Sequence, residues 1–231
     1  MQEIRVRTNQ IELQVRDYAH EGEAILFLHF GGTNLMVWQR VVPYFQDRYR
    51  LILVDLRGHG KSDIPEGGYH MDEMARDVVG VLDYLHIDKA HIIGSSLGAE
   101  VGLSLAVNHQ NRLLSLVLDG ALHSEFGPFG LWEGTEEAFY AHVNTQLEKI
   151  RNAPVAKFPT LDALMQTRKE LYEKYDWWNE YVAEMERYGA LQLEDGHYIK
   201  GWGHPYLWML NPDEACKVIL KFLDAQELSL M

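Results

Sequence analysis

Four short apolar runs, each separated from the next by a segment with helical periodicity, constrain the fold of this chain most. The runs are "AILFLHF", "RLILVD", "AHIIG" and "LLSLVLDG", and unbroken apolar strands of this kind are covered on both faces. Between them, residues 36–47, 71–86 and 97–108 place apolar side chains at helical spacing. Because strands alternate with helices, we predict a mostly parallel α/β sheet with right-handed crossovers, flanked by helices.

The chain divides into two patterns. Ahead of the apolar runs, "EIRVR" and "IELQV" alternate apolar and polar residues, which predicts half-buried antiparallel strands. From about Leu122 the pattern changes, and residues 135–189 read as three amphipathic helices with no strand among them. A last helix is predicted at "NPDEACKVILKFL". We therefore predict a core in residues 1–122, a helical lid in 123–190 and the rest of the core in 191–231.

Composition and charge exclude several classes of function. The chain has 231 residues, of which 47% are hydrophobic and 24% charged, as in a globular domain. Its net charge of −13 argues against nucleic-acid binding and against polyanionic substrates. A single cysteine, Cys216, rules out a disulfide framework. The sequence shows no signal peptide and no apolar run of the ~20 residues that a membrane span requires. We expect a soluble, cytoplasmic protein that acts on a small molecule, without nucleic-acid or membrane partners.

The strongest chemical motif is "HIIGSSLGAE", in which Gly94, Ser96 and Gly98 form G-x-S-x-G between a predicted strand and a predicted helix. Such a turn is so sharp that the serine takes strained backbone angles, and only small neighbours let the strand and helix pass closely. The Ser96 hydroxyl would then lie at a helix N-terminus, where the N–H of Leu97 favours a negative oxygen. The alternative is an ordinary Gly/Ser-rich turn, but the flanking elements favour a nucleophile.

Two glycine-containing loops follow predicted strands. In "LHFGGTNLMVW", the N–H of Gly31 is our candidate for a second oxyanion donor, and a plain glycine turn is the alternative. The loop "DLRGHGKSD", residues 55–63, lacks the spacing of a phosphate-binding P-loop, so we predict a tight structural loop. The remaining histidines show no spacing typical of metal ligands, and we expect neither a metal nor another cofactor.

The order of these motifs, H-x-G-G-T, D-L-R-G-H-G-K-S, G-S-S-L-G-A and then G-x-G-H-P, resembles the α/β-hydrolase superfamily of lidded serine esterases and lipases. The resemblance covers residues 1 to about 122 and resumes at about 201. It implies Ser96 as the nucleophile, His204 as the base, and an oxyanion hole from the N–H groups of Leu97 and Gly31. One departure is Phe30, which places a ring in the oxyanion loop where this superfamily has a glycine.

A second departure concerns the catalytic acid. In this superfamily the lid is followed by a strand that ends in the acid, then a helix and a further strand, which together need at least ~25 residues. The stretch between the last lid helix and His204 can hold one short strand, "HYIKG", and no more. The acid-bearing strand is therefore missing from its usual place. Asp119, at the end of "LLSLVLDG", and Asp195, in the turn "EDG", are the two replacements, and the absence of any acid is the third reading.

These inferences combine into one functional prediction. We expect a serine hydrolase that forms an acyl-enzyme with a small neutral or apolar carboxylic ester or a related acyl compound. Phe30, Trp132, Trp177 and Trp178 would line the acyl pocket, although the tryptophans could instead pack the lid. The alternative is a non-catalytic or catalytically weak protein that binds a small ligand or partner beneath the lid. Loss of the acid strand would also expose a sheet edge, which a second copy of the chain could cover.

Overall fold

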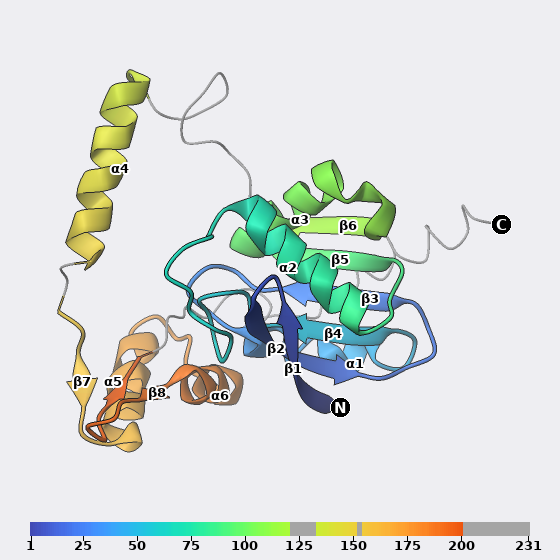
Figure 1. Cartoon of the computed structure of the whole chain (residues 1–231). Helices are drawn as coiled ribbons and strands as arrows, with labels where there is room; N and C mark the ends of the chain where they lie inside the picture. The colour runs from blue at the N-terminus through green and yellow to red at the C-terminus, as the bar shows by residue number, and fades with distance from the viewer. Residues whose placement is uncertain (121–132, 152–153, 201–231) are drawn as a thin grey trace.

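A computed structural model describes residues 1–120, 133–151 and 154–200 (Figure 1). The predictions for Trp132, His204 and the last helix lie outside the described residues. In the described part of the chain, no helix combines the length and the apolarity needed to cross a membrane.

Six strands form one mixed sheet, in the order β1-β2-β4-β3-β5-β6. Their bounds are β1 (Gln2–Thr8), β2 (Ile11–Tyr18), β3 (Ala24–Leu28), β4 (Arg50–Val54), β5 (Ala90–Ser95) and β6 (Leu113–Asp119). The first two strands are antiparallel to their neighbours, whereas β4, β3, β5 and β6 run parallel to one another. The predicted mostly parallel α/β sheet is confirmed. Parallel strands end at one common edge, so the loops after β3, β4, β5 and β6 gather there.

The helices between the strands follow the prediction with one correction. They are η1 (Leu35–Trp38), α1 (Val42–Phe45), α2 (Met71–Tyr84), α3 (Leu97–Asn108) and η2 (Gln110–Arg112). The prediction of a single helix over residues 36–47 is wrong. Pro43 has no N–H to donate within a longer helix, and it lies instead in the first turn of the short α1. The helix α2 ends two residues early, and His86 beyond it takes a positive φ of 55°.

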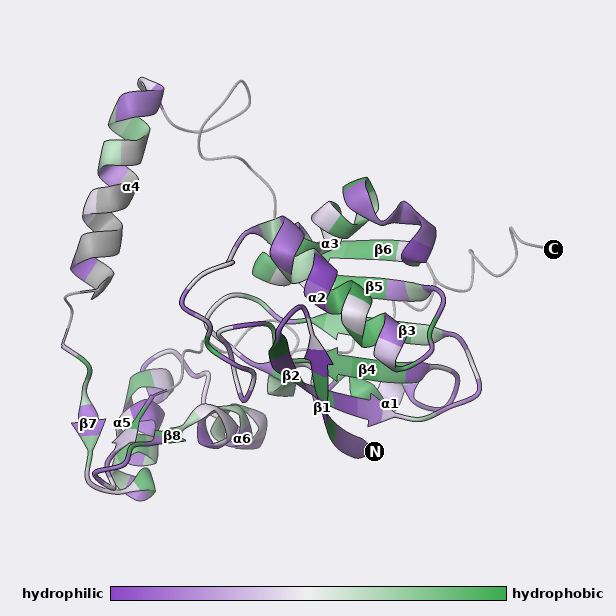
Figure 2. Cartoon of the chain, viewed as in Figure 1, coloured by the Kyte–Doolittle hydropathy of each residue, from purple (hydrophilic) through white to green (hydrophobic). Residues whose placement is uncertain are grey.

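Alternate residues of the central strands supply two apolar clusters, one on each face of the sheet. Leu26 and Leu28 of β3 pack with residues of α2 and α3. Ile25 and Phe27, on the opposite face, pack with η1, α1 and buried residues from two later helices. In Figure 2 the central strands are mostly coloured as hydrophobic, whereas α2 carries both hydrophobic and hydrophilic residues.

The second part of the chain holds three helices and a small sheet. These elements are α4 (Glu136–Arg151), β7 (Lys157–Phe158), α5 (Leu161–Glu173), α6 (Glu180–Gly189), β8 (Leu191–Gln192) and β9 (Tyr198–Ile199). The three predicted helices are confirmed. The prediction that no strand lies among them is wrong, because β7 joins a sheet of order β7-β9-β8. The prediction of only one strand after α6 is also wrong, because Gly196 at φ 84° lets β8 and β9 form a hairpin. In Figure 1, α4 extends away from the rest of the molecule.

Candidate active site

The turn between β5 and α3 is a strained strand-to-helix turn with Ser96 at its tip. Ser96 has φ 46° and ψ −113°, outside the usual regions for a residue with a side chain. A Cβ at Gly94 would lie 2.3 Å from the carbonyl oxygen of Gly98, and a Cβ at Gly98 would lie 2.2 Å from that of Leu28. Both glycines are therefore required by close backbone approach, as the motif predicts.

Hydrogen bonds fix the backbone on either side of Ser96. Its N–H donates to the carbonyl oxygen of Asp119 at 2.8 Å, and its own carbonyl oxygen accepts from Ala99 at 2.8 Å and Glu100 at 3.0 Å. The residue is partly exposed and immediately precedes the 12-residue helix α3. Ser96 is thus held at the positive end of a helix, with room for another molecule to approach its hydroxyl.

The loop after β3, which we call the oxyanion loop (residues 29–34), lies against the start of α3. A Cβ at Gly31 would be 3.7 Å from the Cβ of Leu97, which is ordinary van der Waals contact. The cause is the parallel pairing of β3 with β5, which places Leu28 opposite Gly94. The structure brings Gly31 and Leu97 together beside Ser96, and their use as oxyanion donors stays a prediction.

His29 holds the oxyanion loop, a role that our reading of the sequence missed. Its fully buried ring accepts a hydrogen bond at Nε2 from the N–H of Leu56 at 3.0 Å. The proton must then be on Nδ1, which donates to the carbonyl oxygen of Phe30 at 2.8 Å. Burial lowers the pKa of His29 to about 3, so the ring is neutral. The Phe30 ring is buried in the apolar cluster beneath the loop, and its contact with substrate stays a prediction.

Asp55 is the second residue of the site that sequence reasoning did not assign. Its carboxylate is fully buried and accepts three hydrogen bonds, from the N–H of Leu35 at 2.6 Å, the N–H of Lys61 at 2.9 Å and the hydroxyl of Tyr188 at 2.8 Å. Burial raises the pKa of Asp55 to about 6, and these bonds offset only part of that rise. The loop of residues 55–63 therefore closes on its own first residue, which confirms the predicted structural loop.

The two candidate acids have different surroundings. Asp119 ends β6 opposite Ser95, and its Oδ2 accepts a hydrogen bond from the Ser95 hydroxyl at 3.0 Å. Asp195 is exposed in the hairpin, where it accepts from Lys157 Nζ at 2.9 Å; chiefly through that bond, the pKa of Asp195 falls to about 2. Asp119 is the one that lies beside the nucleophile's strand. The base with which either acid would pair, His204, lies outside the described residues.

Trp177 and Trp178 lie in the segment between α5 and α6. Trp178 stacks on Tyr172, with ring centroids 6.3 Å apart, and Trp177 lies 5.1 Å from the ring of Tyr175. Both tryptophans pack against the apolar cluster that contains Phe30. Trp177 also helps to line a cavity of about 340 Å³ with Leu171, Tyr172 and Tyr175. Their contact with substrate stays a prediction.

A cavity of about 230 Å³ lies between the 55–63 loop and the β8–β9 hairpin. Its lining comes from the oxyanion loop, from the 55–63 loop with the residue that follows it, and from the hairpin: Thr33, Gly58, His59, Gly60, Ile64, Leu191, Ile199 and Lys200. Within the described ranges, no group of three or more His, Cys, Asp or Glu side chains could hold a metal ion.

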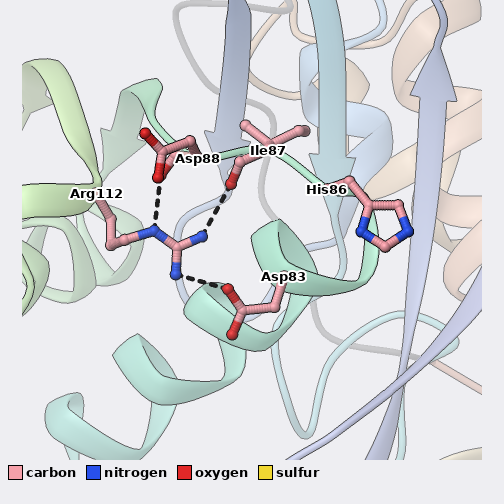
Figure 3. A pocket seen from close by; sticks show the side chains of 5 residues that line it. All are labelled: Asp83, His86, Ile87, Asp88 and Arg112. Carbon is pink, nitrogen blue, oxygen red and sulfur yellow. Dashed lines mark hydrogen bonds and ion pairs between the residues drawn. The ribbon is translucent and has the colours of Figure 1, made fainter.

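Another cavity, of about 420 Å³, lies at the opposite end of β5 from Ser96 and is lined by Asp83, His86, Ile87, Asp88 and Arg112 (Figure 3). Arg112 there bonds the Asp83 carboxylate at 2.7 Å and the carbonyl oxygens of Ile87 and Asp88 at 2.9 and 2.7 Å. These bonds connect the end of α2 to the start of β6, so we interpret Arg112 and its partners as structural.

Known proteins match this chain in both sequence and structure. The chain is 39% identical to 3-oxoadipate enol-lactonase 2 of Acinetobacter baylyi over 106 residues, which are 44% of the chain and 40% of that protein. It is 34% identical to 2-hydroxy-6-oxononadienedioate/2-hydroxy-6-oxononatrienedioate hydrolase of Burkholderia vietnamiensis over 173 residues, 70% of the chain and 60% of that protein. The chain thus spans only about half the length of such curated relatives.

Solved structures agree with the sequence matches. The structure of E-2-(acetamidomethylene)succinate hydrolase is 26% identical, with a TM-score of 0.64 over 93% of this chain and 73% of that one. The family model described as alpha/beta hydrolase fold matches residues 23–193, about three quarters of the chain. The chain belongs to the α/β-hydrolase fold family.

Proposed function

We propose that this protein is a serine hydrolase that cleaves a small neutral or apolar carboxylic ester, or a related acyl compound, through an acyl-enzyme. The observation that carries the proposal is the strained position of Ser96 at the start of α3, with Gly31 against Leu97 beside it. A serine hydroxyl in this geometry is accessible and can attack the carbonyl group of a substrate. Backbone N–H groups near it can stabilise the negative oxygen that the attack creates.

Each step assigns a role to one group. The Ser96 oxygen attacks the carbonyl carbon as His204 takes its proton, and the N–H groups of Leu97 and Gly31 stabilise the carbonyl oxygen as it becomes negative. The tetrahedral intermediate then collapses to the acyl-serine, and His204 returns the proton to the departing alkoxide. Water repeats the sequence, with His204 again as the base, and releases the carboxylic acid and free Ser96.

We further propose Asp119 as the carboxylate that orients His204. It ends the strand next to the nucleophile's strand, and reactive groups of open α/β sheets gather at that edge. Asp195 is the weaker candidate, because its carboxylate is already tied to Lys157 within the small sheet. Asp119→Asn preserves the shape and removes the charge, so turnover should fall by about 10⁴ if Asp119 is the acid. Unchanged turnover would leave His204 without a known partner.

A relative that is named for a lactone supports an ester as the substrate, because a lactone is a cyclic ester. The names of the relatives described above denote compounds derived from carboxylic acids, and Lys200 lines the cavity beside the oxyanion loop. An ester that carries a free carboxylate is therefore the second candidate substrate. Paired p-nitrophenyl esters, one neutral and one ending in a carboxylate, discriminate the two by kcat/KM.

Covalent labelling tests the nucleophile. A fluorophosphonate probe should label the wild-type chain and the Ser95→Ala variant, and labelling should disappear in Ser96→Ala. Ser95 is the matched control, because it is the neighbouring serine and its hydroxyl bonds Asp119. Labelling that persists in Ser96→Ala removes the assignment. A wild-type chain that takes no label supports the other candidate, a weak or non-catalytic protein that binds a small ligand or partner.

The base is tested separately. His204→Ala should abolish hydrolysis of short-chain esters and leave the thermal midpoint nearly unchanged, because a base acts on the reaction rather than on the fold. A variant that unfolds would show instead that His204 is structural.

A further inference from the structure

The helices α5 and α6 are held to each other by a buried polar network. Arg168 on α5 donates two hydrogen bonds to the carboxylate of Glu186 on α6, at 2.9 and 3.0 Å. The Tyr172 hydroxyl donates to the same carboxylate at 2.7 Å and accepts from Arg168 at 2.6 Å. All three side chains are buried, where hydrogen bonds between polar groups are stronger than in water. The pair α5–α6 is therefore one unit.

This unit contacts the core at the end of the oxyanion loop. Asn34 Nδ2 donates to the carbonyl oxygen of Met185 on α6 at 3.3 Å. At Gly189 a Cβ would lie only 2.9 Å from the same Asn34 nitrogen, so the helix end approaches the loop closely. Beside this contact, the Tyr188 hydroxyl donates to the Asp55 carboxylate at 2.8 Å.

The Asp55 carboxylate is shared between α6 and the segment that follows the oxyanion loop. Its Oδ1 accepts from the N–H of Leu35, four residues beyond Gly31, and its Oδ2 accepts from Lys61 and Tyr188. A bond to an ionised carboxylate is about twice as strong as a bond between neutral groups. One buried group therefore connects α6 to the loop that carries the candidate oxyanion donor.

We infer that Tyr188 is a positioning residue for the oxyanion loop, acting through Asp55 on the backbone of Leu35 and so on Gly31. The inference rests on the proposed function, because it concerns the loop assigned to oxyanion stabilisation. Tyr188 does not touch the reacting atoms; its hydroxyl fixes the carboxylate that fixes the loop. Docking of α6 then sets the geometry at Gly31, in addition to covering the sheet.

The replacement Tyr188→Phe isolates the hydroxyl. Lys61 Nζ lies 4.2 Å from the centre of the Tyr188 ring and the Arg16 guanidinium 5.4 Å from it, and phenylalanine retains both cation–π contacts. Tyr181→Phe is the matched control on the same helix. The Tyr181 ring contacts the Arg40 guanidinium at 4.8 Å, and its hydroxyl makes no hydrogen bond within the described structure.

The test measures amide hydrogen exchange in residues 31–37 of the intact chain, the fluorophosphonate labelling rate of Ser96, and the thermal midpoint. In Tyr188→Phe, we expect exchange at the Leu35 amide to rise about tenfold, because the carboxylate that accepts it loses one of its three donors. The labelling rate should fall severalfold. Tyr181→Phe should match the wild type in both measurements.

The outcomes separate this inference from the proposed function. Unchanged exchange at Leu35 in Tyr188→Phe, or an equal rise in Tyr181→Phe, overturns the inference. Faster exchange with a wild-type labelling rate also overturns it, because the hydroxyl then holds the loop without serving the site. If the wild-type chain takes no label, the proposed function fails, and exchange at Leu35 still decides whether Tyr188 controls the loop.

Discussion

The six-stranded sheet and the segment from α4 to β9 are stabilised in different ways. In the sheet, all five residues of β3 are buried, and two apolar clusters, one on each face, join the strands to their helices. One cluster includes α2 and α3, and the other includes Tyr172 of α5 with Val182 and Met185 of α6. In the later segment, α5 and α6 bury only four residues each, among them Arg168 and Glu186. In Figure 2 the central strands are mostly hydrophobic, whereas α5 and α6 mix hydrophobic and hydrophilic residues. Apolar packing fixes the interior of the sheet, whereas α5 and α6 add directed polar bonds to their apolar contacts with that interior.

This difference decides how each region responds to change. A packed sheet has no alternative arrangement for its backbone, so an added atom is opposed by many contacts at once. The docking of α6 combines the apolar contacts of Val182 and Met185 with hydrogen bonds such as that from Tyr188 to Asp55, so loss of one such bond can weaken the docking and leave the fold intact. The predictions below test that contrast.

The largest effect is expected at the sheet, from Gly98→Ala. Alanine normally stabilises a helix relative to glycine by about 0.5–1 kcal/mol. Here its Cβ would lie 2.2 Å from the carbonyl oxygen of Leu28, a backbone atom that cannot turn aside. We expect the free energy of unfolding to fall by more than about 4 kcal/mol, measured by urea denaturation.

Gly67→Ala is the control for that substitution. A Cβ at Gly67 meets nothing within 4 Å in the structure, so stability should change by less than about 0.5 kcal/mol. A Gly98→Ala variant as stable as this control would show that the strand-to-helix turn has more room than the structure gives it.

The same contrast explains what sequence could predict. The turn at Ser96 was predicted because its causes are local: two glycines at fixed spacing between a strand and a helix. The three helices of the later segment were predicted from periodicity. The error over residues 36–47 had a local cause too. The effect of Pro43 on that helix could have been predicted directly from the sequence.

The contacts that position the site are not local, and periodicity carries no signal for them. Tyr188 and Asp55 are 133 residues apart. Nothing in an amphipathic helix distinguishes Tyr188, whose hydroxyl bonds Asp55, from Tyr181, whose ring also packs against the core. The strands β8 and β9 are two residues long, too short for any alternation to show. His29 had no visible role, because the partner that fixes its tautomer, Leu56, belongs to a different loop.

A smaller effect is expected within the helical segment, from Arg168→Met. Methionine fills much of the same volume but leaves the Glu186 carboxylate, 2% exposed, without its cation. Loss of one partner of a buried ion pair costs about 3–5 kcal/mol. Because the pair joins α5 to α6, we expect this loss of stability to appear as local opening of the two helices. Hydrogen exchange should become faster in both helices and stay unchanged in β3 and β5.

Arg187→Met is the matched control, since Arg187 is an exposed arginine next to Glu186 on the same helix. It should leave exchange in α5 and α6 near the wild-type rates. If Arg168→Met speeds exchange in the sheet as strongly as in the helices, the two regions unfold together and the contrast between them is wrong.

The smallest effect is expected at the contact between the two regions, from the titration of Asp55. The charged and titratable groups that face its carboxylate are Lys61, on the same loop, and Tyr188, on α6. Burial raises the pKa of Asp55 from 3.8 to about 6, so between pH 4 and 6 the folded state binds more protons than the unfolded state. Stability from this group is therefore full below about pH 4 and is lost as pH rises through 6.

Asp55→Asn removes that titration, so the variant is the reference against which the wild type is compared. The difference in unfolding free energy between wild type and Asp55→Asn should decrease by about 2–3 kcal/mol from pH 4 to pH 6.5, since one unit of pKa shift corresponds to 1.36 kcal/mol. Above pH 7 the difference should be constant. The cost of placing an amide among three donors is the same at every pH, so it does not contribute to the change with pH. Urea denaturation of both proteins at each pH measures it. A difference that grows with pH over this range would mean that the three hydrogen bonds outweigh burial and hold the pKa of Asp55 below its ordinary value, and that α6 docks on a carboxylate that stays ionised throughout.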